Sequence, residues 1–239
     1  KSIRNGYNTY MNIKHKKPTL TKKQRHKLRV QQVRRQKIFL TCLFLLIVGC
    51  ILLRFSKFSG RQEEAHQINA ACEAYRDEVS SEAAQYDMSK YVDLILAVMM
   101  QESSGQGTDP MQSSEGAYNT RYPQQPNGIT DPSYSISCGI QELKYALDKA
   151  GCTGPTDLSK IRLALQAYNF GADSYFAYLE ENGQTVWTAQ SAQAFAQMAS
   201  GGTQRDEDDP LHDPAGPWDY GDQYYPDHVL RYYHLDNNS

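Results

Sequence analysis

One long apolar run stands out near the start of the chain. Residues 38–53 are sixteen in number and contain no charged side chain, and Lys37 and Arg54 flank them. A helix of that length spans about 24 Å, and Phe55 with the two basic side chains extends its reach toward the headgroups of a bilayer. The pattern predicts one transmembrane helix over residues 38–55.

Beyond residue 62 apolar positions recur every three or four residues, which is the period of an α-helix. A first helix is predicted over 63–86, where Ile68, Cys72 and Val79 share one stripe. Further helices are predicted over 90–101 with Ser89 as N-cap, 134–150, 158–169, 172–181 and 188–198, with a final aromatic-rich helix or turn over 220–233. No segment alternates as a strand does, so the predicted fold class is all-α.

Two polar stretches interrupt the helical pattern. Residues 103–132 are rich in Gly, Pro, Ser and Asn, and residues 201–217 form an acidic loop. A loop of about thirty residues inside a compact domain is unusual and tends to carry function. The first stretch is therefore a candidate functional loop.

The charges are segregated along the chain. Residues 1–61 hold sixteen Lys and Arg and no acid, whereas the remainder holds nine Lys and Arg against 27 Asp and Glu, a net charge of −18. Thirteen basic residues precede the apolar run, and three follow it closely, at Arg54, Lys57 and Arg61. The positive-inside rule then predicts a cytoplasmic N-terminus and an extracellular acidic domain.

Other interpretations of the N-terminal part are less favoured. A cleaved signal peptide has a shorter basic leader and a cleavage site of small residues, and the lipoprotein-like box at 47–50 is followed by more apolar residues. A nucleic-acid-binding arm over 1–37 is disfavoured because its charge lies beside the membrane span, where anionic lipids attract it. We therefore expect the membrane, and no nucleic acid, as a partner.

Cysteine and histidine spacing adds little. Three cysteines, Cys72, Cys138 and Cys152, lie beyond the predicted span. One disulfide between two of them is possible, and Cys138 and Cys152 are the pair nearer in sequence. No Cys-x-x-Cys pattern and no His pair with metal-ligand spacing occurs. We expect no metal and no cofactor.

Glu102 ends a strongly apolar helix, and Gly105 follows at a position that suits a helix break. A carboxyl group at the negative end of a helix dipole, among apolar neighbours, is expected to have a raised pKa. A glycosidase needs such a group, an acid that stays protonated until it protonates a glycosidic oxygen. A solvated glutamate near a helix end is the simpler interpretation, and this argument alone leaves both open.

Four short motifs follow each other in the chain: Gln-Glu-Ser-Ser-Gly at 101–105, Asp-Pro-Met-Gln-Ser-Ser-Glu-Gly at 109–116, Tyr-Ser-Ile-Ser-Cys-Gly at 134–139 and Ala-Tyr-Asn-Phe-Gly at 167–171. Each is weak alone. In this order they resemble the lysozyme-like muramidase domain of CwlT-type cell-wall hydrolases, which conjugative elements of Gram-positive bacteria carry. More distantly they are similar to goose-type lysozymes and soluble lytic transglycosylases. The resemblance covers roughly residues 65–235 and implies a lysozyme-like helical domain.

The resemblance also implies roles for individual residues. Glu102 matches the catalytic acid, and Asp109 matches the acid implicated beside it. The expected substrate-binding residues are Ser103, Gln112, Ser114, Glu115, Gln141, Tyr168 and Asn169. Simpler interpretations are a turn that starts at Asp109 and a helix that ends at Gly171.

The expected function is cleavage of the MurNAc–GlcNAc β-1,4 bond of peptidoglycan outside the cell, which opens the wall locally for conjugative transfer. Proteins of the conjugation machinery are then further partners. Hydrolysis and formation of an anhydro product by a lytic transglycosylase both remain open, as does a component of the conjugation apparatus that binds peptidoglycan without cutting it. CwlT-type proteins usually continue into a cysteine peptidase domain, and because no peptidase Cys/His signature occurs here, we expect no peptidase activity.

The expected organisation has five parts: a basic leader at 1–37, the transmembrane helix at 38–55, a linker at 56–64, the lysozyme-like domain at 65–235 and a tail at 236–239.

Overall fold

The computed structural model describes residues 67–209 and 212–234. The chain divides into two units after residue 62, and every described residue belongs to the second unit. The predicted leader, transmembrane helix, linker and tail lie outside the described residues. Within the described ranges, no helix has both the length and the apolar character that a membrane span requires.

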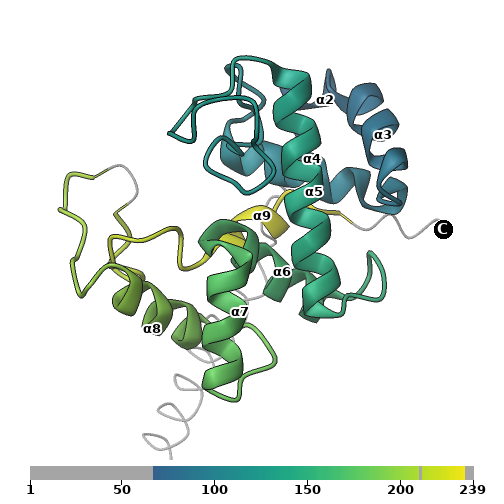
Figure 1. Cartoon of the computed structure of the whole chain (residues 1–239). Helices are drawn as coiled ribbons and strands as arrows, with labels where there is room; N and C mark the ends of the chain where they lie inside the picture. The colour runs from purple at the N-terminus through teal and green to yellow at the C-terminus, as the bar shows by residue number, and fades with distance from the viewer. Residues whose placement is uncertain (1–66, 210–211, 235–239) are drawn as a thin grey trace, which may run out of the picture. The chain divides into compact units, whose positions relative to one another are not determined.

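The described part of the chain is helical (Figure 1). Its helices are α2 (Ala70–Glu73), α3 (Arg76–Gln85), the 3₁₀-helix η1 (Ser89–Tyr91), α4 (Val92–Glu102), α5 (Pro132–Ala150), α6 (Leu158–Phe170), α7 (Ala172–Glu181), α8 (Ala189–Ala199) and α9 (Tyr225–Leu230). The only β-type pairing in the described ranges is an isolated bridge between Gln204 and Trp218. The all-α prediction is therefore confirmed for these residues.

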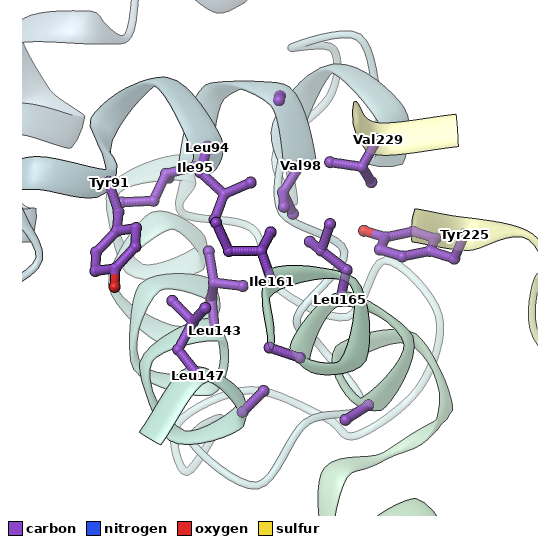
Figure 2. Close-up of a cluster of buried hydrophobic side chains, with 14 of the residues drawn as sticks. Tyr91, Leu94, Ile95, Val98, Leu143, Leu147, Ile161, Leu165, Tyr225 and Val229 are labelled. Carbon is purple, nitrogen blue, oxygen red and sulfur yellow. The ribbon is translucent and has the colours of Figure 1, made fainter. Parts of the chain in front are cut away.

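Helix α4 lies at the centre of the core. Every residue from Leu94 to Met99 is fully buried, so this helix is apolar all round. Figure 2 shows side chains of α4, α5, α6 and α9 pointing toward one another, with Tyr225 and Val229 contributed by α9. Burying each large aliphatic side chain contributes roughly 1.5–3 kcal/mol. The core thus fixes the end of α4, and with it Glu102, against α9.

Two predicted boundaries in the N-terminal part were wrong. The helix predicted over 63–86 is two helices within the described part, because the chain turns at Ala74 and Tyr75 between α2 and α3. Asn69 caps α2 by accepting a hydrogen bond from the backbone N–H of Cys72 at 2.8 Å. Ser89 starts the 3₁₀-helix η1 instead of capping α4. A turn of 3₁₀-helix therefore precedes the α-helix that was predicted over 90–101.

Local capping explains the other helix ends. Helix α5 begins two residues earlier than predicted, because Asp131 caps it and Pro132 occupies its first position. It ends at Gly151, which has a φ of 70°. Thr188, predicted to start α8, is instead its N-cap, and its hydroxyl accepts a hydrogen bond from the N–H of Ser191. The helix or turn predicted over 220–233 contains only six helical residues, those of α9.

Candidate active site

Glu102 is the last residue of α4, and the loop that leaves it is held in a fixed turn. Ser104 and Gly105 both have a positive φ, of 55° and 73°. A Cβ atom at Gly105 would lie 2.8 Å from the backbone nitrogen of Cys72, so only glycine fits there. Ser103 donates a hydrogen bond from its hydroxyl to the carbonyl of Pro110 at 2.8 Å. The predicted substrate-binding Ser103 therefore ties the loop to the end of α4.

Glu102 has a partner from the far end of the domain. The hydroxyl of Tyr225, in α9, donates a hydrogen bond to Oε1 of Glu102. The Tyr225 ring stacks on the ring of Tyr168 at 6.3 Å between centroids and 22° between planes. Tyr168 in turn donates its hydroxyl hydrogen to the carbonyl of Met111 at 2.9 Å. Three segments, α4, α6 and α9, therefore meet at this carboxyl group.

The environment of Glu102 raises its pKa to about 7. Burial is the largest cause, since the charged form loses its hydration, and the negative charges of Asp222, Asp109 and Glu142 add to it. The hydrogen bond from Tyr225 acts in the opposite direction, because it stabilises the carboxylate. The side chain remains partly exposed. At neutral pH a substantial fraction of Glu102 thus carries a proton that it can donate.

The end of α6 holds the segment that leads into α9. Asn169 accepts a hydrogen bond from the backbone N–H of Asp222 at 2.7 Å, and Gln166 donates one to the carbonyl of Asp222 at 2.8 Å. Gly221 packs directly against Asn169, because a Cβ atom at Gly221 would lie only 2.6 Å from Oδ1 of Asn169. Asn169 was predicted as a sugar contact, and in the structure its side-chain oxygen positions the segment that carries Tyr225.

Asp109 is buried, with 1% of its surface exposed, and its carboxylate is the centre of a hydrogen-bonded loop. Oδ1 accepts from the N–H of Ser113 at 3.0 Å and from the hydroxyl of Ser135 at 2.6 Å. Oδ2 accepts from the N–H of Ser114 at 3.1 Å and from the hydroxyl of Ser114. Both oxygens are therefore occupied by the loop and by α5, an arrangement that favours a role in shaping the loop.

Ser114 and Gln112 extend this loop structure. The Ser114 hydroxyl also accepts a hydrogen bond from the N–H of Ile129 at 2.8 Å, and Ser114 is buried. Gln112 has a φ of 47°, and its amide donates to the carbonyl of Asp109 and to Oδ1 of Asn127, both at 2.9 Å. The long polar stretch is thus closed on itself by side-chain hydrogen bonds instead of by secondary structure.

A cleft of about 590 Å³ lies beside this loop, and we call it the main cleft. It brings together four of the predicted substrate-binding residues. Its lining includes Gln112, Glu115, Gly116, Ala117, Tyr118, Glu142, Tyr145, Tyr168, Asn169, Phe170, Gly171, Asp173, Tyr220 and Gly221. Gln141 instead lines a second hollow, where its amide donates to the carbonyl of Ser137 at 3.1 Å.

Glu142 is an acid in the main cleft that the sequence analysis did not single out. Its Oε1 is buried and has no hydrogen-bond partner among the described residues. Gly116 packs against it so closely that a Cβ atom there would lie 1.4 Å from Oε1. Burial raises the pKa of Glu142 to about 7, a hydrogen bond from the backbone of Tyr118 lowers it, and the charge of Asp109 raises it.

Neither a disulfide nor a cluster of metal-ligand side chains occurs among the described residues. Cys72, Cys138 and Cys152 are free cysteines. The possible disulfide between Cys138 and Cys152 is therefore not formed in the structure. No three His, Cys, Asp or Glu side chains gather in these ranges as they would around a metal ion. The chemistry of the site rests on Glu102 and its neighbours.

Residues 70–233 match the family model described as lysozyme-like. The chain belongs to the lysozyme-like family. Its motif-based resemblance to the CwlT-type domain is also confirmed at the level of the sequence. The bifunctional muramidase/DL-endopeptidase CwlT of Bacillus subtilis is 35% identical over 173 residues, which are 72% of this chain and 43% of CwlT.

Other proteins are similar to this chain over shorter stretches. The membrane protein YocA of Bacillus subtilis is 40% identical over 111 residues, 46% of this chain and 45% of YocA. Pneumococcal vaccine antigen A of Streptococcus pneumoniae is 31% identical over 146 residues, 59% of this chain and 65% of that protein. This chain thus spans less than two thirds of each of these relatives.

A solved structure has a similar fold. A Staphylococcus aureus protein of the NLP/P60 family, described as similar to a lipoprotein, superposes with a TM-score of 0.60 at 26% identity. The match covers 73% of this chain and 56% of that one.

Two of the residues that shape the site escaped the sequence analysis for different reasons. Tyr225 lies in an aromatic-rich segment, and no local pattern connects it to Glu102. Glu142, however, is three residues after Gly139 and four before Ala146, both buried, so it interrupts the apolar stripe of α5. A charged residue at such a position is a detectable signal.

Proposed function

We propose that this domain cleaves the MurNAc–GlcNAc β-1,4 bond of peptidoglycan, with Glu102 as the acid. The observation that carries the proposal is the place of Glu102 at the end of α4, where it accepts a hydrogen bond from Tyr225. The ring of Tyr225 stacks on Tyr168, which lines the main cleft. The raised pKa of Glu102, about 7, agrees with this role. The family and the muramidase relative support it. A general acid works best when its pKa lies near the working pH.

In the proposed reaction Glu102 transfers its proton to the oxygen that leaves with GlcNAc, while the bond from that oxygen to C1 of MurNAc breaks and positive charge develops on the ring. In hydrolysis a water oxygen then bonds to C1, and one of its protons passes to a carboxylate of the site. The ionised Glu102 can accept it and so return to its starting state.

A lytic transglycosylase is the second candidate, and the burial of Asp109 favours it. In that reaction the 6-hydroxyl of MurNAc attacks C1 and gives its proton to Glu102, so one carboxyl group is sufficient. Asp109, whose two oxygens are both hydrogen-bonded to the loop and α5, is poorly placed to activate a water molecule. Glu142 lines the main cleft together with Glu115 and Asp173, and because its charge acts on Glu102 it is the carboxyl group that we expect a hydrolase to use.

The place of action is also a proposal. The apolar run at 38–53 and the thirteen basic residues before it support a single span with the domain outside the cell, at the wall. The resemblance to domains carried by conjugative elements supports a role in opening the wall locally, together with proteins of the conjugation machinery. Protease added to intact protoplasts should remove the domain, and protection of the domain would contradict this topology.

Product analysis tests the reaction. Purified peptidoglycan treated with the full chain should release fragments that carry reducing MurNAc ends if water attacks, or 1,6-anhydro-MurNAc ends if the internal hydroxyl attacks, and mass spectrometry separates the two. The Glu102→Gln variant should release neither. Binding of peptidoglycan by the parent without any release of fragments would instead identify a non-catalytic wall-binding component.

A further inference from the structure

A second hollow of about 570 Å³ lies next to the main cleft. The two cavities share Ala117 and Tyr118, which line both. The carbonyl of Tyr118 accepts a hydrogen bond from the hydroxyl of Tyr134 at 3.1 Å, so the shared segment is fixed to α5. The two cavities are therefore adjacent at this segment.

Arg121 lines the second hollow, and it differs from most other cations of this acidic domain in its polar contacts. Its guanidinium makes no ion pair and no hydrogen bond with the described residues. Most other described cations have polar partners, as Arg76 has in Glu73 and Lys149 has in Asp173. The five N–H groups of Arg121 are therefore available to a ligand.

The arginine is also positioned, because its guanidinium lies over the ring of Tyr134 at 4.6 Å. The Tyr134 hydroxyl accepts a hydrogen bond from the N–H of Thr120 at 2.9 Å, and Tyr122 packs on the same ring at 5.5 Å. A cation stacked on a fixed ring loses less conformational freedom when it binds an anion. Two acids, Glu82 and Asp131, line the same hollow, so it offers both signs of charge.

We propose that the second hollow binds the peptide stem of peptidoglycan, with Arg121 as the residue that recognises a stem carboxylate. This inference rests on the proposed function, because the stem branches from the lactyl group of MurNAc while the sugars occupy the main cleft. Stem peptides carry carboxylates and, on a diamino acid, an amine. Arg121 matches the first group, and Glu82 and Asp131 match the second. The domain then prefers stem-bearing glycan to bare glycan.

Binding to two probes tests the proposal. The probes are a GlcNAc–MurNAc tetrasaccharide with its stem peptides and the same tetrasaccharide after an amidase has removed them. The full chain with Glu102→Gln is used, so that the probes stay intact, and Arg121→Gln is added to it. We expect Arg121→Gln to raise the Kd of the stem-bearing probe about tenfold or more, the effect of a lost charge-assisted hydrogen bond, and to leave the Kd of the bare probe unchanged.

Lys90→Gln is the matched control. It removes the same charge from another cation that lies over a tyrosine ring, 5.2 Å from that of Tyr91, and Lys90 lines neither cavity. It should leave the Kd of both probes unchanged. An equal effect of Arg121→Gln on both probes, no effect on either, or no binding of the stem-bearing probe at all would overturn the proposal. Failure of the proposed function is separate, since it shows as an absence of cleavage by the parent chain.

Discussion

Tyr225 donates a hydrogen bond to Glu102 across 123 residues of sequence. The two residues belong to α9 and α4, and the end of α6 holds them together through Tyr168, which stacks on Tyr225, and Asn169, which binds the backbone before α9. Burial raises the pKa of Glu102 and the tyrosine hydroxyl lowers it, with a result of about 7. The pKa of the candidate acid is thus a property of the assembled domain.

Replacing Glu102 by Gln should abolish release of peptidoglycan fragments while helical circular dichroism stays unchanged, since the amide keeps the shape but has no acidic proton. The pKa of Glu102 lies near 4.5 in the unfolded chain and near 7 in the fold. Between these values the folded state binds more protons, so the parent loses stability as pH rises from about 5 to 7. The Tm of the variant relative to the parent should therefore increase over that range, and a constant difference would contradict the raised pKa.

Replacing Tyr225 by Phe should move the alkaline limb of the pH–activity profile upward. The lost hydroxyl stabilised the carboxylate of Glu102, so its pKa rises and the acid stays protonated to higher pH. The measurement is kcat/KM from pH 5 to 9. Tyr168→Phe is the control, because that hydroxyl bonds to Met111 instead, and its alkaline limb should stay in place. An unmoved limb in Tyr225→Phe would remove the tyrosine from the tuning of Glu102.

Replacing Glu142 by Gln should move the same limb in the opposite direction. The charge of Glu142 is one cause of the raised pKa of Glu102, and the neutral amide removes it. The alkaline limb should then shift to lower pH. Glu115→Gln also removes an acid of the main cleft, but the charge of Glu115 is not among the causes of the raised pKa of Glu102. The alkaline limb of the Glu115→Gln profile should therefore stay where it is in the parent. Identical profiles for both variants would refute the assignment.

Replacing Asp109 by Asn should lower activity and Tm together. The carboxylate accepts from Ser113, Ser114 and Ser135, and an amide presents one oxygen and two unwanted donors to them. A double-mutant cycle with Ser135→Ala should show coupling in the free energy of unfolding, because both changes break one contact. The hypothesis that Asp109 acts in catalysis expects a different result, a large loss of kcat with an unchanged Tm.

Replacing Gly139 by Ala should destabilise the domain by about 1–3 kcal/mol, a typical cost of overpacking. The new Cβ atom would lie 2.6 Å from Cβ of Met111, so α5 would push the 109–114 loop away. Urea unfolding measures the loss. Gly154→Ala is the control, since nothing lies within 4 Å of a Cβ atom there, and it should unfold like the parent.

Much of this protein was determined by local sequence. The period of apolar residues located every long helix of the described ranges, and the predicted ends at 134–150 and 188–198 differ from those of α5 and α8 by no more than two residues. Glu102 at the end of an apolar helix already indicated a raised pKa, and four motifs in order indicated the family. These features depend on neighbours within a few turns of helix, which is the range over which backbone geometry and capping act.

Only the tertiary structure decided which side chains act together. Tyr225 reaches Glu102 because α9 packs on α4, and the carboxylate of Asp109 is closed off because Ser135 of α5 lies against it. Gln141 and Glu142 are adjacent in sequence, yet successive positions on a helix point about 100° apart, so one lines the second hollow and the other the main cleft. Burial and charge at each carboxyl group depend on contacts between distant segments, and a pKa is therefore set only when the chain has folded.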